Sequence, residues 1–386
     1  MDDDEDVRHR MASPNDYSSP RATKRQKRTH DSTDVYERHV APTRLSHRDY
    51  TVGWICALPC ELAAAKAVLD ATHDPLPSDP QDDNIYTLGQ IHQHYVVIAS
   101  LPKGRLGMNP AAVVASNMQR SYPSVHMRLL VGVGGGVLGE VDVRLGDVVI
   151  GEKVVQWDLG KTHADGHFES TAVPCRPPSE LMQGVATLCA LHEIQSSQIP
   201  AILNALQQQY PSMSPYTDNS QLQDWLYESD YPHTGSFHTC EQCCSTRRQL
   251  RDRRRSKHPR IHYGTIASGN QVIRDAPTRD QRSAANYNAL CFEMEAAGLP
   301  DNFPHLVIRG ICDYADSHKN KQWQPYASGT AAAYAKELLS VLPLRVPEVS
   351  SHNGKRVSLC WKDLTDKHSV HVPTGPPTRT SSIPVL

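Results

Sequence analysis

The sequence lacks any apolar run long enough to cross a membrane. Its longest nearly apolar stretch, Leu129–Gly139, is about half of the ~20 residues that a transmembrane helix needs, and it is rich in glycine. The chain also lacks an excess of either charge, because 40 Lys and Arg residues oppose 42 Asp and Glu residues, for a formal net charge of −2. The first absence rules out a membrane-spanning segment, and the second gives no reason to expect a protein that coats a polyanion.

A secretory signal peptide is not recognisable at the acidic start, MDDDED, and the ten cysteines are irregularly spaced. This combination is typical of a reducing compartment rather than of a disulfide framework. We therefore expect an intracellular protein, either cytoplasmic or nuclear. The run Arg21–Arg28 has five bases in eight residues and is open to three interpretations: a nuclear import signal, a nucleic-acid contact or a solvated tail.

Composition divides the chain into a folded domain between two polar tails. Residues 1–48 have few apolar side chains and are predicted to be disordered, as are residues 346–386, where Pro, Ser and Thr accumulate. Residues 49–345 form the expected domain. Within it, residues 211–260 are polar, interrupted by proline and basic near their end, so we expect an insertion or a long loop there.

Inside the domain, short runs rich in Val and Ile alternate with alanine-rich stretches. This alternation of strands and helices indicates an α/β layer structure with a largely buried sheet. Regular structure is also expected at residues 262–267 and 291–299, for which we do not choose between a strand and a helix. The expected strands are residues 51–58, 95–101, 129–133, 147–150, 154–157 and 305–311, and the expected helices are residues 61–70, 110–120, 175–210 and 328–342.

Gly134, Gly136 and Gly139 have the spacing G-x-G-x-x-G after an expected strand, which indicates dinucleotide binding when a helix follows. Residues 140–147 instead alternate like a strand and end at a turn, so no helix N-terminus is available for a pyrophosphate. A dinucleotide site is therefore not expected. The glycines would instead let a flat ligand approach the backbone at the end of a strand, or form a tight turn.

Three acidic residues lie beside apolar runs, where their side chains would be poorly solvated. Glu61 falls in the first turn of an expected helix, Glu295 lies in the segment FEMEAAGL, and Asp313 ends an expected strand. Structural roles also explain them, because an acid favours a helix N-terminus and Glu293 or Glu295 could pair with Arg309. Their positions at strand ends and helix starts predict one common edge of the sheet, where open α/β sheets hold ligands.

Five segments together match the pattern of a known family: ALPCELAAAK, LLVGVGGGV, IASGNQVI, FEMEAAG and IRGICDYADSHKNKQWQ. With these segments the chain resembles the nucleoside phosphorylase and purine nucleosidase superfamily, particularly the fungal domains at the front of multidomain immune-receptor-like proteins. The resemblance covers roughly residues 50–345 and implies a three-layer α/β/α sandwich around a mixed, partly barrel-like central sheet, a homo-oligomer and no cofactor.

The resemblance assigns roles to individual residues. Asp313 matches the acid that protonates N7 of the purine, and Glu61 matches the acid that activates water. Such a pair suits cleavage of an N-glycosidic bond, because the sugar becomes oxocarbenium-like while the departing base needs a proton. The residues matched to substrate binding are Glu295 and Met294 at the ribose, Gly134 and Gly135 at the base and ribose, and Ser268, Gly269 and Asn270 against the base.

Departures from the family pattern favour water over phosphate as the nucleophile. Phosphorylases of this superfamily hold phosphate with two arginines, whereas this chain has Ala63 or Ala64 at the first position and Leu130 at the second. The charge of Glu61 would also repel phosphate. We therefore expect hydrolysis of a purine nucleoside or nucleotide. Two alternatives stay open: a phosphate-dependent purine nucleoside phosphorylase and a non-catalytic module that senses nucleosides.

The cations Lys103, Arg105 and Arg144 lie in segments that could face the 5′ side of the sugar. They are interpreted either as contacts to a 5′-phosphorylated substrate, ATP included, or as solvated side chains. The base and the 5′ substituent are not fixed by the sequence.

Two other patterns are set aside. Cys240-x-x-Cys243, with Cys244, His233 and His238 nearby, looks like half of a zinc site, but the second pair of ligands is missing, so no metal is expected. The run Arg247–Arg260, with eight bases in fourteen residues and no aromatic residues between them, is interpreted as a solvated, disordered loop. Neither nucleic acid nor a membrane is an expected partner.

Overall fold

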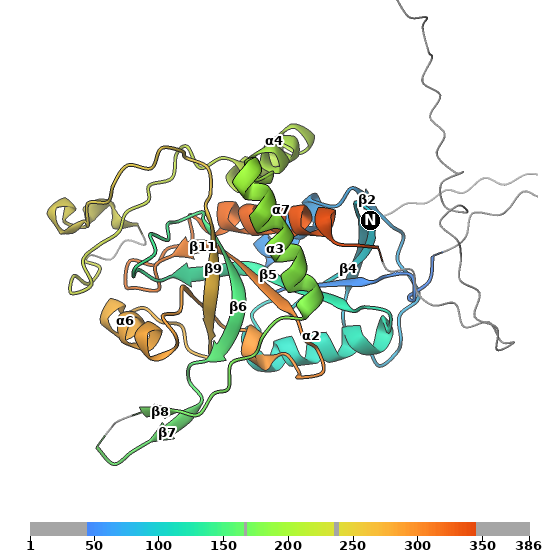
Figure 1. Cartoon of the computed structure of the whole chain (residues 1–386), viewed down its shortest axis with the longest axis horizontal. Helices are drawn as coiled ribbons and strands as arrows, with labels where there is room; N and C mark the ends of the chain where they lie inside the picture. The colour runs from blue at the N-terminus through green and yellow to red at the C-terminus, as the bar shows by residue number, and fades with distance from the viewer. Residues whose placement is uncertain (1–44, 166–167, 235–238, 345–386) are drawn as a thin grey trace, which may run out of the picture. The chain divides into compact units, whose positions relative to one another are not determined.

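The computed structural model describes residues 45–165, 168–234 and 239–344 (Figure 1). The expected tail 346–386 and nearly all of the tail 1–48 lie outside these ranges, as does the basic run Arg21–Arg28. Among the described helices, none combines the length and the apolar character needed to cross a bilayer.

A nine-stranded mixed sheet forms the centre of the domain, in the order β10-β9-β6-β11-β5-β1-β4-β3-β2. Strands β4, β1, β5 and β11 are parallel, and β6 runs antiparallel to β11. Because β10 also pairs with β5, the strands β5, β11, β6, β9 and β10 close into a ring. The bounds are β1 Val52–Cys56, β2 Ala71–Thr72, β3 Tyr86–Ile91, β4 His94–Ser100, β5 Met127–Gly136, β6 Val148–Gln156, β9 Ile261–Ser268, β10 Cys291–Glu293 and β11 Leu306–Asp313.

Helices cover both faces of this sheet, which confirms the expected three-layer arrangement. Helices α1, α3, α4 and α7 pack on one side, and α2 packs against β1 and β4 on the other (Figure 1). Strand β1 joins the two cores, because Trp54 belongs to one hydrophobic cluster and its neighbour Ile55 to the other. The helix bounds are α1 Pro59–Ala67, α2 Met108–Ser121, α3 Ser179–Ile194, α4 Ile199–Gln209, α5 Ser214–Thr217, α6 Ala276–Ala285 and α7 Gln324–Val341.

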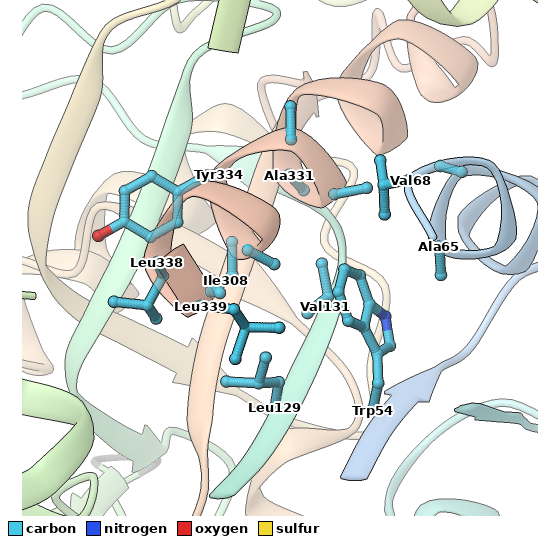
Figure 2. Packing of buried hydrophobic residues seen from close by; sticks show 14 of the residues in the cluster. Trp54, Ala65, Val68, Leu129, Val131, Ile308, Ala331, Tyr334, Leu338 and Leu339 are labelled. Atoms are coloured by element: carbon cyan, nitrogen blue, oxygen red, sulfur yellow. The ribbon is translucent and has the colours of Figure 1, made fainter. Parts of the chain in front are cut away.

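Small residues let α7 lie directly on the sheet. A Cβ atom at Gly310 of β11 would overlap the backbone carbonyl of Ala327 in α7. The close approach brings Tyr334 of α7 to the core that Leu129 and Trp54 form from the strands below (Figure 2). Strand β11, which carries Arg309 and Asp313, is therefore held firmly from one side.

Several elements differ from the expectations. The separate strands expected at 147–150 and 154–157 are one strand, β6, and the helical stretch 175–210 is two helices that are split just before Pro200. Strand β3 and helix α6 were not expected. A short hairpin, β7 (Gly160–Thr162) and β8 (Phe168–Ser170), extends from the body of the domain (Figure 1).

The stretch 211–260 is largely irregular, as expected, with α5 and the 3-10 turns Pro211–Met213, Cys240–Gln242 and Ser245–Arg247. Its basic end is not a solvated loop, and that interpretation is wrong for two residues. The side chains of Arg251 and Arg254 are only 13% and 10% exposed, and each lies 2.7 Å from a carboxylate oxygen, of Asp224 and Asp147 respectively. Acids elsewhere in the chain neutralise these bases, which composition alone does not reveal.

Candidate active site

The carboxylate of Glu61 is buried and held entirely by backbone groups. Glu61 lies in the first turn of α1, where its Oε2 atom accepts hydrogen bonds from the N–H groups of Ala57 (2.7 Å) and Leu58 (2.9 Å). Its Oε1 atom accepts a third from the N–H of Val133 in β5 (2.8 Å). Burial raises the pKa of Glu61 above its ordinary value, although the nearby Arg309 guanidinium and these hydrogen bonds oppose the rise.

Arg309 is the cation at the centre of this cluster. Its side chain is 1% exposed in the middle of β11, and Nη2 forms an ion pair with Oε2 of Glu293 and lies 3.6 Å from Oε2 of Glu295. Both pairings that the sequence suggested are therefore present. A Cβ atom at Gly132 would collide with both Glu61 and Arg309, so only glycine leaves room for the two side chains.

Glu295 connects the cluster to the N-terminus of α2. Its Oε1 atom accepts a hydrogen bond from the N–H of Gly107 (3.2 Å), and the residue is only 5% exposed. Burial, above all, raises the pKa of Glu295 to about 7, with Arg309 opposing the rise and the charges of Glu293 and Glu61 adding to it. Its neighbour Met294 is half-buried.

Asp313 ends β11 directly beside Gly135 of β5. Its Oδ1 atom accepts a hydrogen bond from the N–H of Ala315 (2.9 Å), and its Oδ2 atom lies 3.1 Å from Nζ of Lys319. A Cβ atom at Gly135 would come within 2.8 Å of Oδ1, so glycine at that position leaves space for the carboxylate. Asp313 also lines a cavity of about 300 Å³, whose lining includes residues of 221–225 and 239–241 but neither Glu61 nor Glu295.

The loop at 268–270 is tied to the same region. The Oγ atom of Ser268 accepts a hydrogen bond from the N–H of Ala297 (2.9 Å), two residues after Glu295. Asn270 accepts one from the N–H of Met108 (3.2 Å) through its Oδ1 atom. Asn270 and Glu295 therefore hold adjacent N–H groups at the start of α2. Gly269 lies against the indole ring of Trp157, where a side chain would not fit.

These contacts place the residues singled out in the sequence around the ends of β5 and β11. Glu61 and Glu295 both lie near Arg309. Asp313 of β11 pairs with Gly135 of β5, two residues beyond Val133, whose N–H donates to Glu61, and Gly134 faces Cys291 of β10. Arg144 instead pairs with Asp142 (2.8 Å), while Lys103 and Arg105 are exposed on the loop before Gly107. The arrangement offers buried carboxylates of differing environment beside bare backbone, which suits acid–base chemistry.

Reasoning from the sequence missed the central position of Arg309 and the cation beside Asp313. A lone arginine in the apolar strand LVIRGICD was the available signal for the first, since a buried guanidinium needs carboxylates around it. Lys319 gave no such signal, because its contact with Asp313 depends on the turn after β11.

Substitution of Glu295 by Gln is expected to stabilise the fold at high pH. The pKa of Glu295 is raised to about 7 from 4.5, so the folded protein binds the proton of this acid more tightly than the unfolded chain does. The stabilisation of the fold by this proton is complete below pH 4.5 and is lost as the pH rises through 7. Gln resembles the neutral acid, so the free energy of unfolding of Glu295→Gln relative to wild type should increase by about 1–3 kcal/mol between pH 5 and pH 8.5. Urea denaturation at both pH values measures the change, and the exposed Glu152→Gln is the matched control. If the free energies of unfolding of the variant and the wild type differed by the same amount at both pH values, the pKa of Glu295 would not be raised.

Comparison with known proteins gives a family match over most of the domain. Residues 51–340 match the model of the phosphorylase superfamily. A nucleotide-binding leucine-rich repeat (NLR)-like protein from Hyaloscypha variabilis is 42% identical over 306 residues, which cover 77% of this chain and 30% of that protein. The chain therefore spans about a third of that relative's length.

Two further relatives are named as nucleosidases. The 5′-methylthioadenosine/S-adenosylhomocysteine nucleosidase of Mycobacterium tuberculosis is 25% identical over 300 residues, which cover 76% of this chain and 97% of that protein. The ATP nucleosidase Cap17 of Escherichia coli is 34% identical over a shorter stretch of 84 residues, which covers 20% of this chain and 17% of that protein.

Proposed function

Because the chain belongs to the phosphorylase superfamily, we propose that it hydrolyses the N-glycosidic bond of a purine nucleoside or nucleotide and releases the free base. The observation that carries this proposal is the environment of Glu61: a buried carboxylate held by three backbone N–H groups beside an arginine that other acids already engage. The relatives named as nucleosidases support the same reaction class.

In this reaction Asp313 donates a proton to N7 of the purine as the bond between C1′ and the base nitrogen breaks. The bonding electrons leave with the base, and positive charge develops on the sugar. The N–H of Ala315 and the Nζ atom of Lys319, both near the Asp313 oxygens, then stabilise the carboxylate left behind.

Water completes the reaction at C1′. Glu61 takes one proton from the water while the water oxygen forms a bond to C1′. This step yields the free sugar. Its raised pKa suits this role, because a general base is most effective when its pKa lies near the working pH. Glu295 accepts hydrogen bonds from the ribose hydroxyls, and Met294 packs on the sugar. Gly134, Gly135 and the loop 268–270 contact the base and ribose.

Phosphate is a poor substitute for water here. The two positions where phosphorylases of this superfamily carry arginine are apolar. The first is Ala63, which is half-buried, or Ala64, which is 1% exposed, and the second is Leu130, which is fully buried in the core. Neither position therefore supplies a fixed cation to offset the repulsion between a phosphate dianion and the Glu61 carboxylate. Arg309 cannot serve without giving up Glu293 and Glu295.

A nucleotide substrate is favoured by one local feature. Lys103 and Arg105 are exposed on the loop that leads to Gly107, the residue that contacts Glu295. Cations at this end of the proposed ribose site could bind a 5′-phosphate or polyphosphate, and one relative is named an ATP nucleosidase. We therefore include nucleotides, ATP among them, in the substrate class.

Base release from a panel of purine nucleosides and nucleotides tests the proposal. The purified protein is incubated with each compound, once without and once with added phosphate, and free base is measured by chromatography. We expect release from at least one compound, and loss of release in Glu61→Gln, with Glu152→Gln as the matched surface control. Release that requires added phosphate would favour a phosphorylase. Tight binding without any release by the folded protein would favour a sensing module.

A further inference from the structure

Four side chains that can bind a metal meet in space beside the proposed active site. One donor atom each from His233, Cys240, Cys243 and His318 lie within 4.8 Å of one another. Three come from the stretch 211–260, and His318 comes from the turn after β11. The sequence interpretation that the cysteine pair lacks a second pair of ligands is therefore wrong, because His233 and His318 supply that pair. Spacing did not reveal it, since 75 residues separate His318 from Cys243 in the chain.

The measured distances have the dimensions of a tetrahedral site. The Nδ1 atom of His318 lies 3.6 Å from Sγ of Cys240 and 3.7 Å from Sγ of Cys243. Bonds of about 2.3 Å from zinc to sulfur and about 2.0–2.1 Å to nitrogen, at tetrahedral angles, place these ligand atoms roughly 3.6 Å apart. Only a small rearrangement is needed for one ion to contact both sulfurs and this nitrogen.

The surroundings of His318 set it up as a ligand. Its Nε2 atom lies 3.0 Å from the carbonyl oxygen of Tyr231. A carbonyl only accepts, so Nε2 carries the hydrogen and Nδ1 presents its lone pair to the two sulfurs. Hydrogen bonding of the second ring nitrogen to a carbonyl is the usual support of a metal-bound histidine. The Tyr227 ring, stacked on the imidazole at 4.0 Å, fixes its orientation further.

Burial distinguishes this cluster from a chance grouping on the surface. Cys240, Cys243 and His318 are 6%, 5% and 8% exposed, and aromatic residues surround the sulfurs. Two thiolates and two neutral imidazoles form a closed set with no position left for substrate, and thiolates favour zinc over hard cations such as magnesium. Cys244, next in the chain, is exposed and stands outside the cluster.

We propose that His233, Cys240, Cys243 and His318 bind one structural zinc ion, which fastens the stretch 211–260 to the turn after β11. The same turn carries Lys319, whose Nζ atom lies 3.1 Å from Asp313. The ion thereby positions the residues around Asp313 without touching the substrate. Zinc binding at this site does not depend on the proposed reaction. Only the consequence for catalysis through Asp313 rests on the proposed function.

Metal analysis of the full-length protein tests the site. The chain is produced without a polyhistidine tag, dialysed against metal-free buffer and analysed by mass spectrometry for zinc. We expect about one zinc ion per chain, and loss of that ion in the double variant Cys240→Ser with Cys243→Ser. The matched control Cys244→Ser should retain it. A wild-type protein with less than about a tenth of an equivalent, or a double variant that keeps its zinc, overturns the proposal.

Cobalt substitution decides the matter even if the double variant does not fold. Wild-type protein loaded with Co²⁺ is expected to show the intense visible absorption of tetrahedral cobalt and a thiolate-to-cobalt charge-transfer band. His318→Ala should weaken both. Absorption of octahedral cobalt without the charge-transfer band contradicts the proposal. So does an intact mass lower by two hydrogens, which would indicate a disulfide between Cys240 and Cys243.

Discussion

Asp313→Asn is expected to lower the rate of base release by about 10²–10⁴-fold, the usual contribution of a positioned general acid. Asparagine has the same shape and can still accept the hydrogen bond from Ala315, but it has no proton to give to N7 of the purine. The loss should appear in kcat more than in KM, because the proton transfer matters only as the bond breaks. Initial rates of base release at saturating substrate measure it.

Folding of the variant must be shown separately, because Asp313 also contacts Lys319. Circular dichroism and a thermal melting curve serve this purpose. Asp74→Asn, an exchange of the same atoms at an exposed position, is the control and should keep full activity. A folded Asp313→Asn protein with an unchanged rate on every active purine substrate would remove Asp313 from the mechanism.

Arg309→Met is expected to lower the free energy of unfolding by about 3–5 kcal/mol, the usual effect of breaking a buried ion pair from one side. Methionine fills much of the volume but leaves the buried carboxylates of Glu293, Glu295 and Glu61 without their cation. Urea denaturation near pH 8 measures the loss. At pH 5 the loss should be smaller, because protonation removes part of the unpaired charge.

Arg128→Met is the control for the loss of an arginine from the sheet. Arg128 lies in β5, where its guanidinium stacks on the Phe303 ring and donates to the carbonyl of Asn302. Its replacement should cost less and should not depend on pH in the same way. If the two variants lost equal stability at both pH values, Arg309 would not be the counterion of the acidic cluster.

Much of the fold was predictable from local patterns. The Val- and Ile-rich runs at β1, β4, β5 and β11 and the alanine-rich α7 are long and periodic enough to identify, and their alternation indicates an α/β layer structure. The three-layer sandwich itself was implied by the family resemblance. The sequence did not predict strand β3, because few of its positions are buried. It did not predict α6, because the segment APTRDQRSAA has a weak apolar face. Local pattern carries little information about such elements, since tertiary contacts stabilise them.

The site was predictable only in part, and for a physical reason. Glu61, Glu295 and Asp313 stand out because each is an acid inside or beside apolar sequence, and the roles proposed for them rest on the family pattern. The approach of Arg309 to Glu61 and the meeting of His318 with Cys240 depend on contacts between distant segments. Neither spacing nor composition encodes such contacts, so they required the structure.

Identification of the sugar product tests the central claim most directly. The protein is incubated with its best purine substrate in phosphate buffer, and the sugar released with the base is analysed by mass spectrometry and phosphorus NMR. Hydrolysis through Glu61 predicts a sugar with a free hydroxyl at C1, at a rate independent of phosphate concentration. A C1-phosphorylated sugar, formed faster as phosphate is raised, would contradict the account.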